Sequence, residues 1–205
     1  MSEEAMDVRT AADLMRQTRE RTRSALEVRL PPVYAAWGVA WLGGLGTMWL
    51  SVRDQQPYRE PSGLSAAVYG VLSCLAVTVT ITVVIRATRG VGGVSARQGR
   101  MYGVAWLFGF SAVFVIDAAL ASHGASQAVQ GIAYATAPVV VTALIYLVGA
   151  AVWLDISMFI LGAWLALVSA VAAWTGPVDV LAIEALAGGG GFLLAAALVL
   201  RRQRA

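Results

Sequence analysis

Apolar and polar positions alternate in long blocks along the chain. A helix needs about 20 predominantly apolar residues to span a hydrocarbon core about 30 Å thick, and several blocks reach this length. The block over residues 131–174 is too long for one crossing, so we expect a tight turn within it, near residues 153–155. The pattern predicts an all-α polytopic membrane bundle of six transmembrane helices. The predicted helices occupy residues 33–51, 64–85, 102–121, 131–151, 156–174 and 179–200.

The composition favours the same class of protein. Hydrophobic residues make up 59% of the 205 residues, charged residues make up 13%, and the mean hydropathy is +0.71. These values lie well outside the range of soluble globular domains. Charged residues concentrate in residues 1–30, which we expect to form a cytoplasmic amphipathic helix ahead of a transmembrane domain over residues 31–205.

The residue types offer little from which to build a catalytic centre. All fifteen basic residues are arginine, so the chain has no lysine amine for a Schiff base or a phosphate-binding loop. Cys74 is the single cysteine and His123 the single histidine, too few for a cysteine-based or clustered metal site. We therefore expect a protein that is not an enzyme and that uses no cofactor and no metal.

The arginines predict the orientation of the bundle. With six crossings, thirteen arginines fall on one side of the membrane, and only Arg53 and Arg59 fall on the other. The positive-inside rule then puts both termini in the cytoplasm, in a bacterial plasma membrane. The thirteen are Arg9, Arg16, Arg19, Arg21, Arg23, Arg29, Arg86, Arg89, Arg97, Arg100, Arg201, Arg202 and Arg204.

A short phrase recurs in three of the predicted helices. GVAWL occupies residues 38–42 and again 103–107, and LGAWL occupies residues 161–165. All three copies fall in helices that run from the inside to the outside. The recurrence is consistent with three repeated helical hairpins, as in many membrane bundles, or with chance matching in a sequence rich in Gly, Ala, Val and Leu.

Small residues spaced four apart accompany this phrase. In lipid, such residues let helix backbones approach closely, and close packing holds helices together. We predict packing stripes on helices one, three and six, and the stripe on helix one is also a candidate docking surface for a partner helix. The stripes are Ala36, Ala40 and Gly44; Ala105 and Gly109; and Ala187, Gly191 and Ala195.

Two resemblances rest on these features. The charged N-terminal segment, the stretch YAAWGVAWL over residues 34–42, the six crossings and the arginine-rich tail resemble a group of small integral membrane proteins from high-GC actinobacteria. Gly162, Trp164, the stretch WTGP over residues 174–177 and the glycine run over residues 188–191 are more weakly similar to the six-helix HdeD-like membrane proteins. Both resemblances imply a six-helix membrane fold, and neither supplies a catalytic residue.

Two acidic residues lie within predicted membrane helices. An ionisable group in such a helix costs about 3 kcal/mol on insertion scales and normally faces the bundle or water. We expect Asp117 and Glu184 to approach within hydrogen-bonding or one-water distance around an outward-facing cavity, with one proton retained between them. Tyr134, Thr136 and His123 fall in the same outer layer and complete the predicted ion- or solute-binding site. The alternative is that both acids are isolated structural carboxyls near the interface.

Two backbone features fall in the same helices. The glycine run over residues 188–191 is compatible with an unwound segment, as in transporter sites, or with an uninterrupted, closely packed helix. Pro138 should kink helix four and free the carbonyl of Tyr134.

The polar segment over residues 1–30 suggests a different kind of function. Its apolar stripe is narrow and flanked by arginines, which favours contact with anionic lipid headgroups or with a protein partner. Acidic residues mixed among the arginines argue against nucleic acid as a partner. The first hypothesis is therefore an accessory or regulatory partner of another membrane or cytoplasmic protein. The alternative is a small transporter or solute-binding membrane subunit that uses the acidic site.

Overall fold

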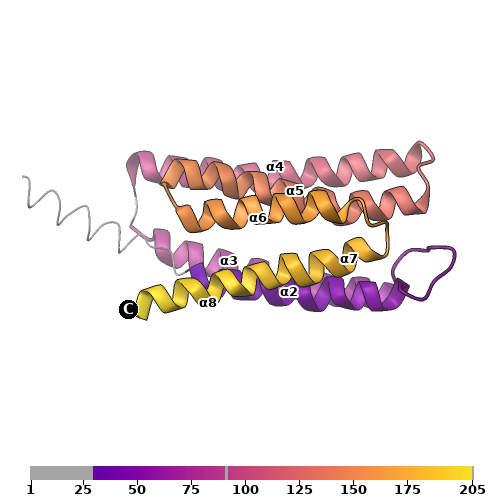
Figure 1. Ribbon diagram of the computed structural model, residues 1–205. Helices are drawn as coiled ribbons and strands as arrows, with labels where there is room; N and C mark the ends of the chain where they lie inside the picture. The colour runs from indigo at the N-terminus through magenta and orange to yellow at the C-terminus, as the bar shows by residue number, and fades with distance from the viewer. Residues whose placement is uncertain (1–29, 91, 205) are drawn as a thin grey trace, which may run out of the picture.

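The computed structural model describes residues 30–90 and 92–204, and Figure 1 shows that the described chain is built from long helices. The predicted all-α class is confirmed, and no strand occurs in the described part. The helix predicted for residues 1–30 lies almost wholly outside the described residues. The elements are α2 (Leu30–Val52), α3 (Gly63–Thr88), α4 (Gly93–Ser122), α5 (Gln127–Trp153), α6 (Ile156–Ala172) and a last helix made of α7 (Asp179–Ile183), the π-helix η1 (Glu184–Gly189) and α8 (Gly190–Arg204).

The helices form two layers. One layer holds α2, α3 and the last helix, and the other holds α4, α5 and α6 (Figure 1). Within the layers, α2 packs against α3 and against the last helix, while α5 packs against α4 and α6. The main contacts between the layers are those of α6 with α7, η1 and α8, together with that of α5 with α7. The two layers therefore meet along the side where α6 faces the last helix.

Four described helices are long and apolar enough to span a membrane. They are α3, α4, α5 and the last helix over Asp179–Gln203, while α6 is a shorter apolar helix of 17 residues. The remaining helix, α2, is 23 residues long and contains many glycine and aromatic residues. It is also rich in buried residues, because it packs against α3 and the last helix. Its composition thus reflects contact with other helices more than contact with lipid.

α4 begins earlier than the sequence predicted. It begins at Gly93, so most of the segment expected to be a loop, residues 89–100, is helical. Hydropathy marks where a chain enters the membrane, whereas this helix extends past that point. Its extra turns contain alanine, glutamine and arginine, which are good helix formers. Gly90 and Gly93 have φ angles of 83° and 70°, which form the turn ahead of these residues.

The expected tight turn between the fourth and fifth helices is present at residues 153–155. Leu154 ends α5 in the left-handed conformation, with a φ angle of 53°. The Asp155 side chain then caps α6, because one carboxyl oxygen accepts hydrogen bonds from the backbone N–H groups of Ser157 (2.8 Å) and Met158 (3.1 Å). This cap explains why an acid interrupts an otherwise apolar stretch.

The glycine run of the last helix is neither unwound nor regular α-helix. It overlaps the π-helix η1, and the chain stays helical throughout. A Cβ added to Gly189 would lie 2.7 Å from the backbone nitrogen of Leu42, so only glycine allows the backbones of η1 and α2 to approach this closely. A Cβ added to Gly191 would likewise lie 2.6 Å from the indole nitrogen of Trp164. Pro138 lies inside α5, which continues as one helix through it.

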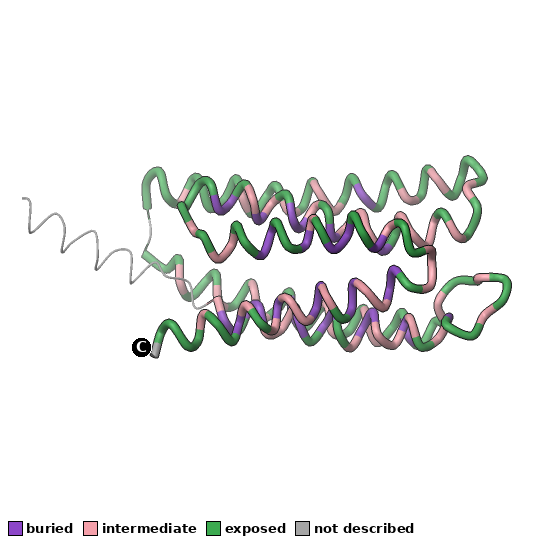
Figure 2. The backbone as a smooth tube through the Cα atoms, viewed as in Figure 1, coloured by how far each residue is buried: buried purple, intermediate pink, exposed green. Residues whose placement is uncertain are grey.

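Burial differs strongly between the helices, as Figure 2 shows. In the most apolar 18-residue window, 44% of α5 and 33% of the last helix are buried, but only 6% of α3 and 6% of α4. Aromatic rings from three helices form the centre of the core. Tyr34, Tyr146, Trp41 and Phe192 meet there at ring-centroid distances of 5.2–6.2 Å.

Candidate functional site

A cavity of about 80 Å³ lies between the two layers, on the side away from α6. It is bounded by residues of α2, α3, α4, α5, α7 and α8, and nine of its sixteen lining residues are aromatic. The aromatic residues are Trp37, Trp41, Tyr69, Trp106, Phe110, Phe114, Tyr134, Tyr146 and Phe192.

A four-residue spacing of large side chains produces this wall. Residues four apart fall on one face of a helix, and α4 places Trp106, Phe110 and Phe114 at this spacing. On α2, Trp37 and Trp41 are also four apart and line the cavity. From the sequence we considered only the small residues beside the repeated phrase, whereas the repeated four-residue spacing of aromatic residues was the signal for a shared cavity.

The rings of the wall contact one another by both their faces and their edges. Trp106 stacks on Phe110 with centroids 5.9 Å apart and an interplanar angle of 20°. The same indole meets Tyr146 edge to face, at 5.9 Å and 86°. Trp41 meets Phe192 edge to face at 5.2 Å. Such pairs stabilise each other beyond their buried area, so the wall is firm enough to keep an internal space.

The volume sets the size of what the cavity can hold. A water molecule needs about 10–15 Å³ on this measure, and an apolar cavity of about 150 Å³ binds benzene. The cavity therefore admits a few waters or a group smaller than benzene. Its one lining threonine, Thr142, donates its hydroxyl to the Pro138 carbonyl at 2.8 Å, so this polar group is already satisfied by its own helix.

A buried carboxyl lies next to this wall. Glu184, the first residue of η1, is 0% exposed, and neither of its carboxyl oxygens has a hydrogen-bond partner. Its Oε2 lies 3.3 Å from the position that a Cβ on Gly188 would take, and two ring atoms of Trp41 lie 3.0 and 3.1 Å from the same position. Because Trp41 also lines the cavity, the carboxyl is about one side chain away from that space.

Ser169 is a polar neighbour of this carboxyl that the sequence did not reveal. It is 1% exposed, lies beside the Glu184 side chain and directs its hydroxyl to the Thr136 carbonyl at 3.2 Å. The Thr136 hydroxyl donates to the Ile132 carbonyl at 2.8 Å. The backbone carbonyl of Thr136 thus accepts a hydrogen bond from Ser169, the neighbour of Glu184, whereas the Thr136 hydroxyl bonds within its own helix. A serine in an apolar helix is common in sequences, which is why Ser169 gave no signal.

Asp117 lies on a different helix pair. It belongs to α4, which packs against α5, whereas the η1 segment that holds Glu184 packs against α2, α6, α7 and α8. Both oxygens of Asp117 are buried without a hydrogen-bond partner. Neither carboxyl has a hydrogen-bond partner, so the two acids do not bond directly to each other. A link through one water stays a prediction, as does the sharing of a proton.

Tyr134 and His123 take different positions. Tyr134 lines the cavity, has 48% of its surface exposed and lies 6.5 Å from Phe114, measured between ring centroids. His123 is exposed at the end of α4, where its Nδ1 lies 2.9 Å from the Ala119 carbonyl oxygen and 3.1 Å from the Ser122 hydroxyl. The structure thus brings Tyr134 to the cavity and leaves His123 at a helix end.

The segment between α2 and α3 folds back onto α5. Tyr58 contacts Gly131, where a side chain would collide with the phenol ring. Burial, and to a smaller extent the nearby Glu60, raise the pKa of Tyr58. Arg53 pairs with Asp54 at 3.2 Å, the only ion pair among residues 30–90 and 92–204. Because Arg53 pairs with Asp54, it is not an ionic partner of Asp117 or Glu184.

The three tryptophans of the repeated phrase lie in three different environments. Trp41 is buried at 4% exposure, Trp106 is half-buried at the cavity, and Trp164 is 43% exposed. The Trp164 indole donates to the Ala187 carbonyl of η1 at 2.9 Å. Whether the phrase reflects duplication stays open.

The predicted packing stripes also differ from one another. Gly44 lies directly against Tyr69 of α3, and a Cβ on Gly109 would lie 2.7 Å from Val141 of α5. Ala40 is buried, but Ala105 is exposed. Ala36, Ala187 and Ala195 are half-buried.

Comparison of the chain with protein-family models, with curated proteins and with solved structures finds no match. The resemblances noted from the sequence therefore stay predictions. The part of the chain that the structure describes has no cluster of three or more His, Cys, Asp or Glu side chains that would hold a metal ion.

Proposed function

We propose that this chain is a non-enzymatic integral membrane protein that binds a small solute or ion in the cavity between its layers. The observation behind the proposal is the cavity itself, about 80 Å³ of space lined largely by aromatic side chains. Protein interiors are packed as densely as organic crystals, so spaces of this size are few in one domain. A mostly apolar pocket with few polar groups is the usual form of a small-molecule site.

The proposal includes six membrane crossings, which the lengths of the two remaining helices support. At about 1.5 Å per residue, the 23 residues of α2 extend about 35 Å and the 17 residues of α6 about 26 Å. The first length exceeds the hydrocarbon thickness of about 30 Å, and local thinning of the bilayer accommodates the second. Burial of α2 inside the bundle removes the need for high hydropathy.

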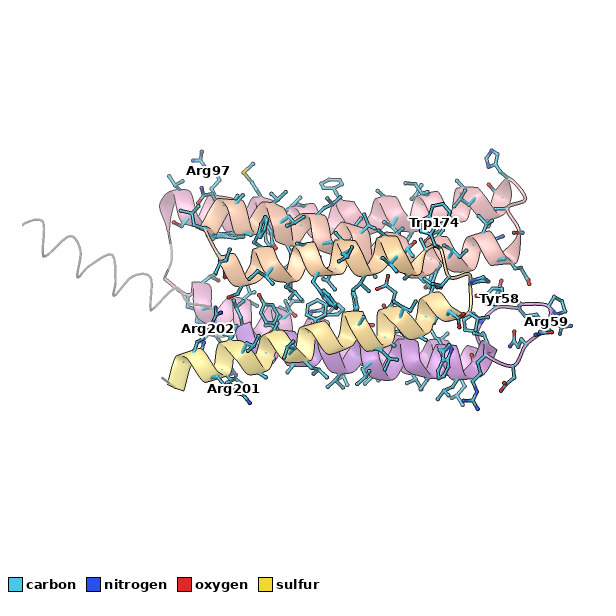
Figure 3. All side chains as sticks on the ribbon, in the orientation of Figure 1. Tyr58, Arg59, Arg97, Trp174, Arg201 and Arg202 are labelled. Carbon is cyan, nitrogen blue, oxygen red and sulfur yellow. The ribbon has the colours of Figure 1, made fainter. Side chains whose placement is uncertain are left out.

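Arginine positions support cytoplasmic termini in a bacterial plasma membrane. In Figure 3, Arg97, Arg201 and Arg202 lie at one end of the bundle, and Arg59 lies at the other together with Trp174. An excess of arginine is typical of the cytoplasmic side. After replacement of Cys74, single cysteines at Ser62 and Ser126 should react with a membrane-impermeant maleimide in intact cells. A cysteine at Ser95 should react only after the cells are opened.

A binding experiment tests the function. Tetramethylammonium and tert-butanol each have five non-hydrogen atoms, one fewer than benzene, and binding of either is measured by intrinsic tryptophan fluorescence and calorimetry of the purified protein. We expect at least one of the two to bind the wild-type protein. Ala135→Leu should abolish that binding, because Ala135 is buried in the cavity wall and leucine would fill the space.

The control is Ala163→Leu, which makes the same change at an exposed position of α6, away from the cavity. This variant should bind like the wild type. The proposal is wrong if neither probe binds, or if Ala135→Leu and Ala163→Leu bind equally well.

A second function, that of an accessory subunit, is supported by a groove on the outside of the bundle. The groove has a volume of about 330 Å³ and lies between α2 and the last helix. Small residues on both sides, among them Gly43, Gly46, Ala182 and Ala185, would allow a membrane helix of a partner protein to pack closely there. Residues 1–29, which the first hypothesis assigns to partner binding, lie outside the described residues.

Purification from gently solubilised native membranes separates the two functions. A stoichiometric membrane protein that is lost with Gly46→Leu but kept with Gly70→Leu would support the accessory role, because nothing lies within 4 Å of a Cβ at Gly70. Loss of a partner on deletion of residues 1–28 would instead indicate binding through the N-terminal segment. Recovery of the protein alone would contradict the accessory role.

A further inference from the structure

We propose that the cavity takes a small cationic group, a methylated ammonium, and that Glu184 supplies its counter-charge. This inference rests on the proposed function, because it names the class of solute that the cavity binds. It is carried by three observations: the aromatic wall, the unpaired buried carboxyl beside it, and the distribution of positive charge along the chain.

The wall offers a cation the surface that it prefers among uncharged side chains. A ring carries negative charge on its face and attracts a cation within about 6 Å of its centre, most strongly when the ring is indole and water is excluded. Three indoles, Trp37, Trp41 and Trp106, line the cavity. Methylated ammonium groups are bound by such aromatic cages because they cannot be matched by strong hydrogen bonds.

The carboxyl provides negative charge that nothing else in its surroundings balances. Glu184 is 0% exposed and has no hydrogen-bond partner on either carboxyl oxygen. A buried ionised group is costly unless it is paired. The group therefore requires either a proton or a cation nearby.

No basic side chain of the bundle can fill that role. The sequence has no arginine or lysine over residues 30–52, 60–85 or 101–200, so all interior stretches of the helices lack positive charge. The ion pair of the described chain, Arg53–Asp54, lies at the end of α2. Within residues 30–90 and 92–204, no side chain therefore supplies a cation to the interior, and a ligand can supply one.

The carboxyl is close enough to act on a group in the cavity. Glu184 and the Trp41 ring both contact the position of Gly188, and Trp41 is part of the cavity wall. One ring thus separates the two charges. Electrostatic attraction over such a distance is much stronger in a water-poor interior than in water.

The test compares a cation with a neutral molecule of the same size and shape. Tetramethylammonium and tert-butanol each have five non-hydrogen atoms, and only the first is charged. We expect tetramethylammonium to bind the wild-type protein more tightly by about tenfold or more, which is the effect of a desolvated cation–aromatic contact. Glu184→Gln should remove most of this preference and leave the affinity for tert-butanol within about twofold, since glutamine keeps the shape of the side chain.

Two further variants make the test specific. Asp179→Asn removes a charge from an exposed residue of the same helix and should keep the preference for the cation. Trp106→Leu removes an indole face and keeps an apolar side chain, so it should lower the ratio of tetramethylammonium affinity to tert-butanol affinity. If Glu184→Gln does not fold, Trp106→Leu still tests the preference for tetramethylammonium over tert-butanol.

The failures of the two proposals are distinguishable. If tert-butanol binds as tightly as tetramethylammonium, or if Glu184→Gln and Trp106→Leu both keep the preference for the cation, the cavity binds solutes but the inference about charge is wrong. If neither molecule binds, the proposed function is wrong as well.

The ammonium group could belong to a free solute or to a lipid headgroup. Titrations in bilayer discs of phosphatidylethanolamine and of phosphatidylcholine distinguish these sources, because both lipids have no net charge and only the second carries a methylated ammonium. Weaker tetramethylammonium binding in phosphatidylcholine discs would identify the lipid headgroup as a competitor, and equal binding would identify a free solute. Both results support a methylated ammonium site, and loss of the preference for the cation in phosphatidylethanolamine discs would overturn it.

Discussion

The two sides of α2 pack by opposite means. Toward the last helix, glycines bring backbones together, with Gly38 and Gly189 so close that a Cβ on either would lie 2.7 Å from an atom of the other helix. Toward α4 and α5, large rings such as Trp41 and Trp106 line the space between the layers, and a cavity remains there. Small residues thus make the side of α2 that faces the last helix closely packed, and we call it the closed side. Aromatic residues leave a cavity on the side that faces α4 and α5, the open side. The same helix thus supplies both the rigid support and the wall of the site.

The largest expected effect comes from adding a side chain on the closed side. Gly189→Leu should lower the free energy of unfolding by about 3 kcal/mol, because its Cβ would collide with the backbone of Leu42, which cannot move aside easily. The melting temperature in detergent should fall by about 6–12 °C. Gly190→Leu is the matched control, since nothing lies within 4 Å of a Cβ there. Equal losses in the two variants would contradict the close contact between η1 and α2.

A change at the boundary between the two sides should act in the opposite direction. Glu184→Leu removes a buried carboxyl without partners and fills its place with an apolar group, so stability should rise by about 2 kcal/mol. The same variant should lose its preference for tetramethylammonium, in line with the cost in function that stabilised sites often show. Thermal melts of this variant and of Asp179→Leu make the comparison. A fall in stability that is specific to Glu184→Leu would indicate a partner for the carboxyl.

A smaller effect is expected where α6 supports the π-helix. Trp164→Phe removes the N–H that donates to the Ala187 carbonyl, which should cost about 1 kcal/mol. Trp174→Phe changes an indole that is 92% exposed and should leave stability unchanged. Hydrogen exchange of the amides of residues 184–190 should speed up only in the first variant. Unchanged exchange would mean that the indole does not stabilise η1.

The parts of the fold that depend on local properties of the chain could be predicted from the sequence, and the parts that depend on contacts between helices could not. The helical class and the turn at Asp155 follow from hydropathy and capping, which are local properties of the chain. The small residues around Gly38 and Gly44 have a known use in membrane helices. The π-helix, by contrast, follows from contacts of Gly189 and Trp164 with two other helices, and no local pattern specifies such contacts.

The candidate site shows the same division. The sequence identified Glu184 as an unusual residue because charge is rare in apolar helices. It paired this residue with Asp117 by depth alone, since depth can be counted along a helix but the neighbours of a helix cannot. Ser169 and the aromatic wall were missed because they belong to six different helices, and their meeting depends on how the two layers pack.

The most direct test of the cavity as a ligand site is proximity between a bound cation and individual indoles. Nuclear Overhauser effects between tetramethylammonium methyl protons and indole protons can be assigned with single Trp→Phe variants. The cavity predicts contacts with Trp37, Trp41 and Trp106, which line it, and none with Trp164 or Trp174, which do not. Contacts confined to Trp164 and Trp174, or contacts with no indole at all, would contradict it.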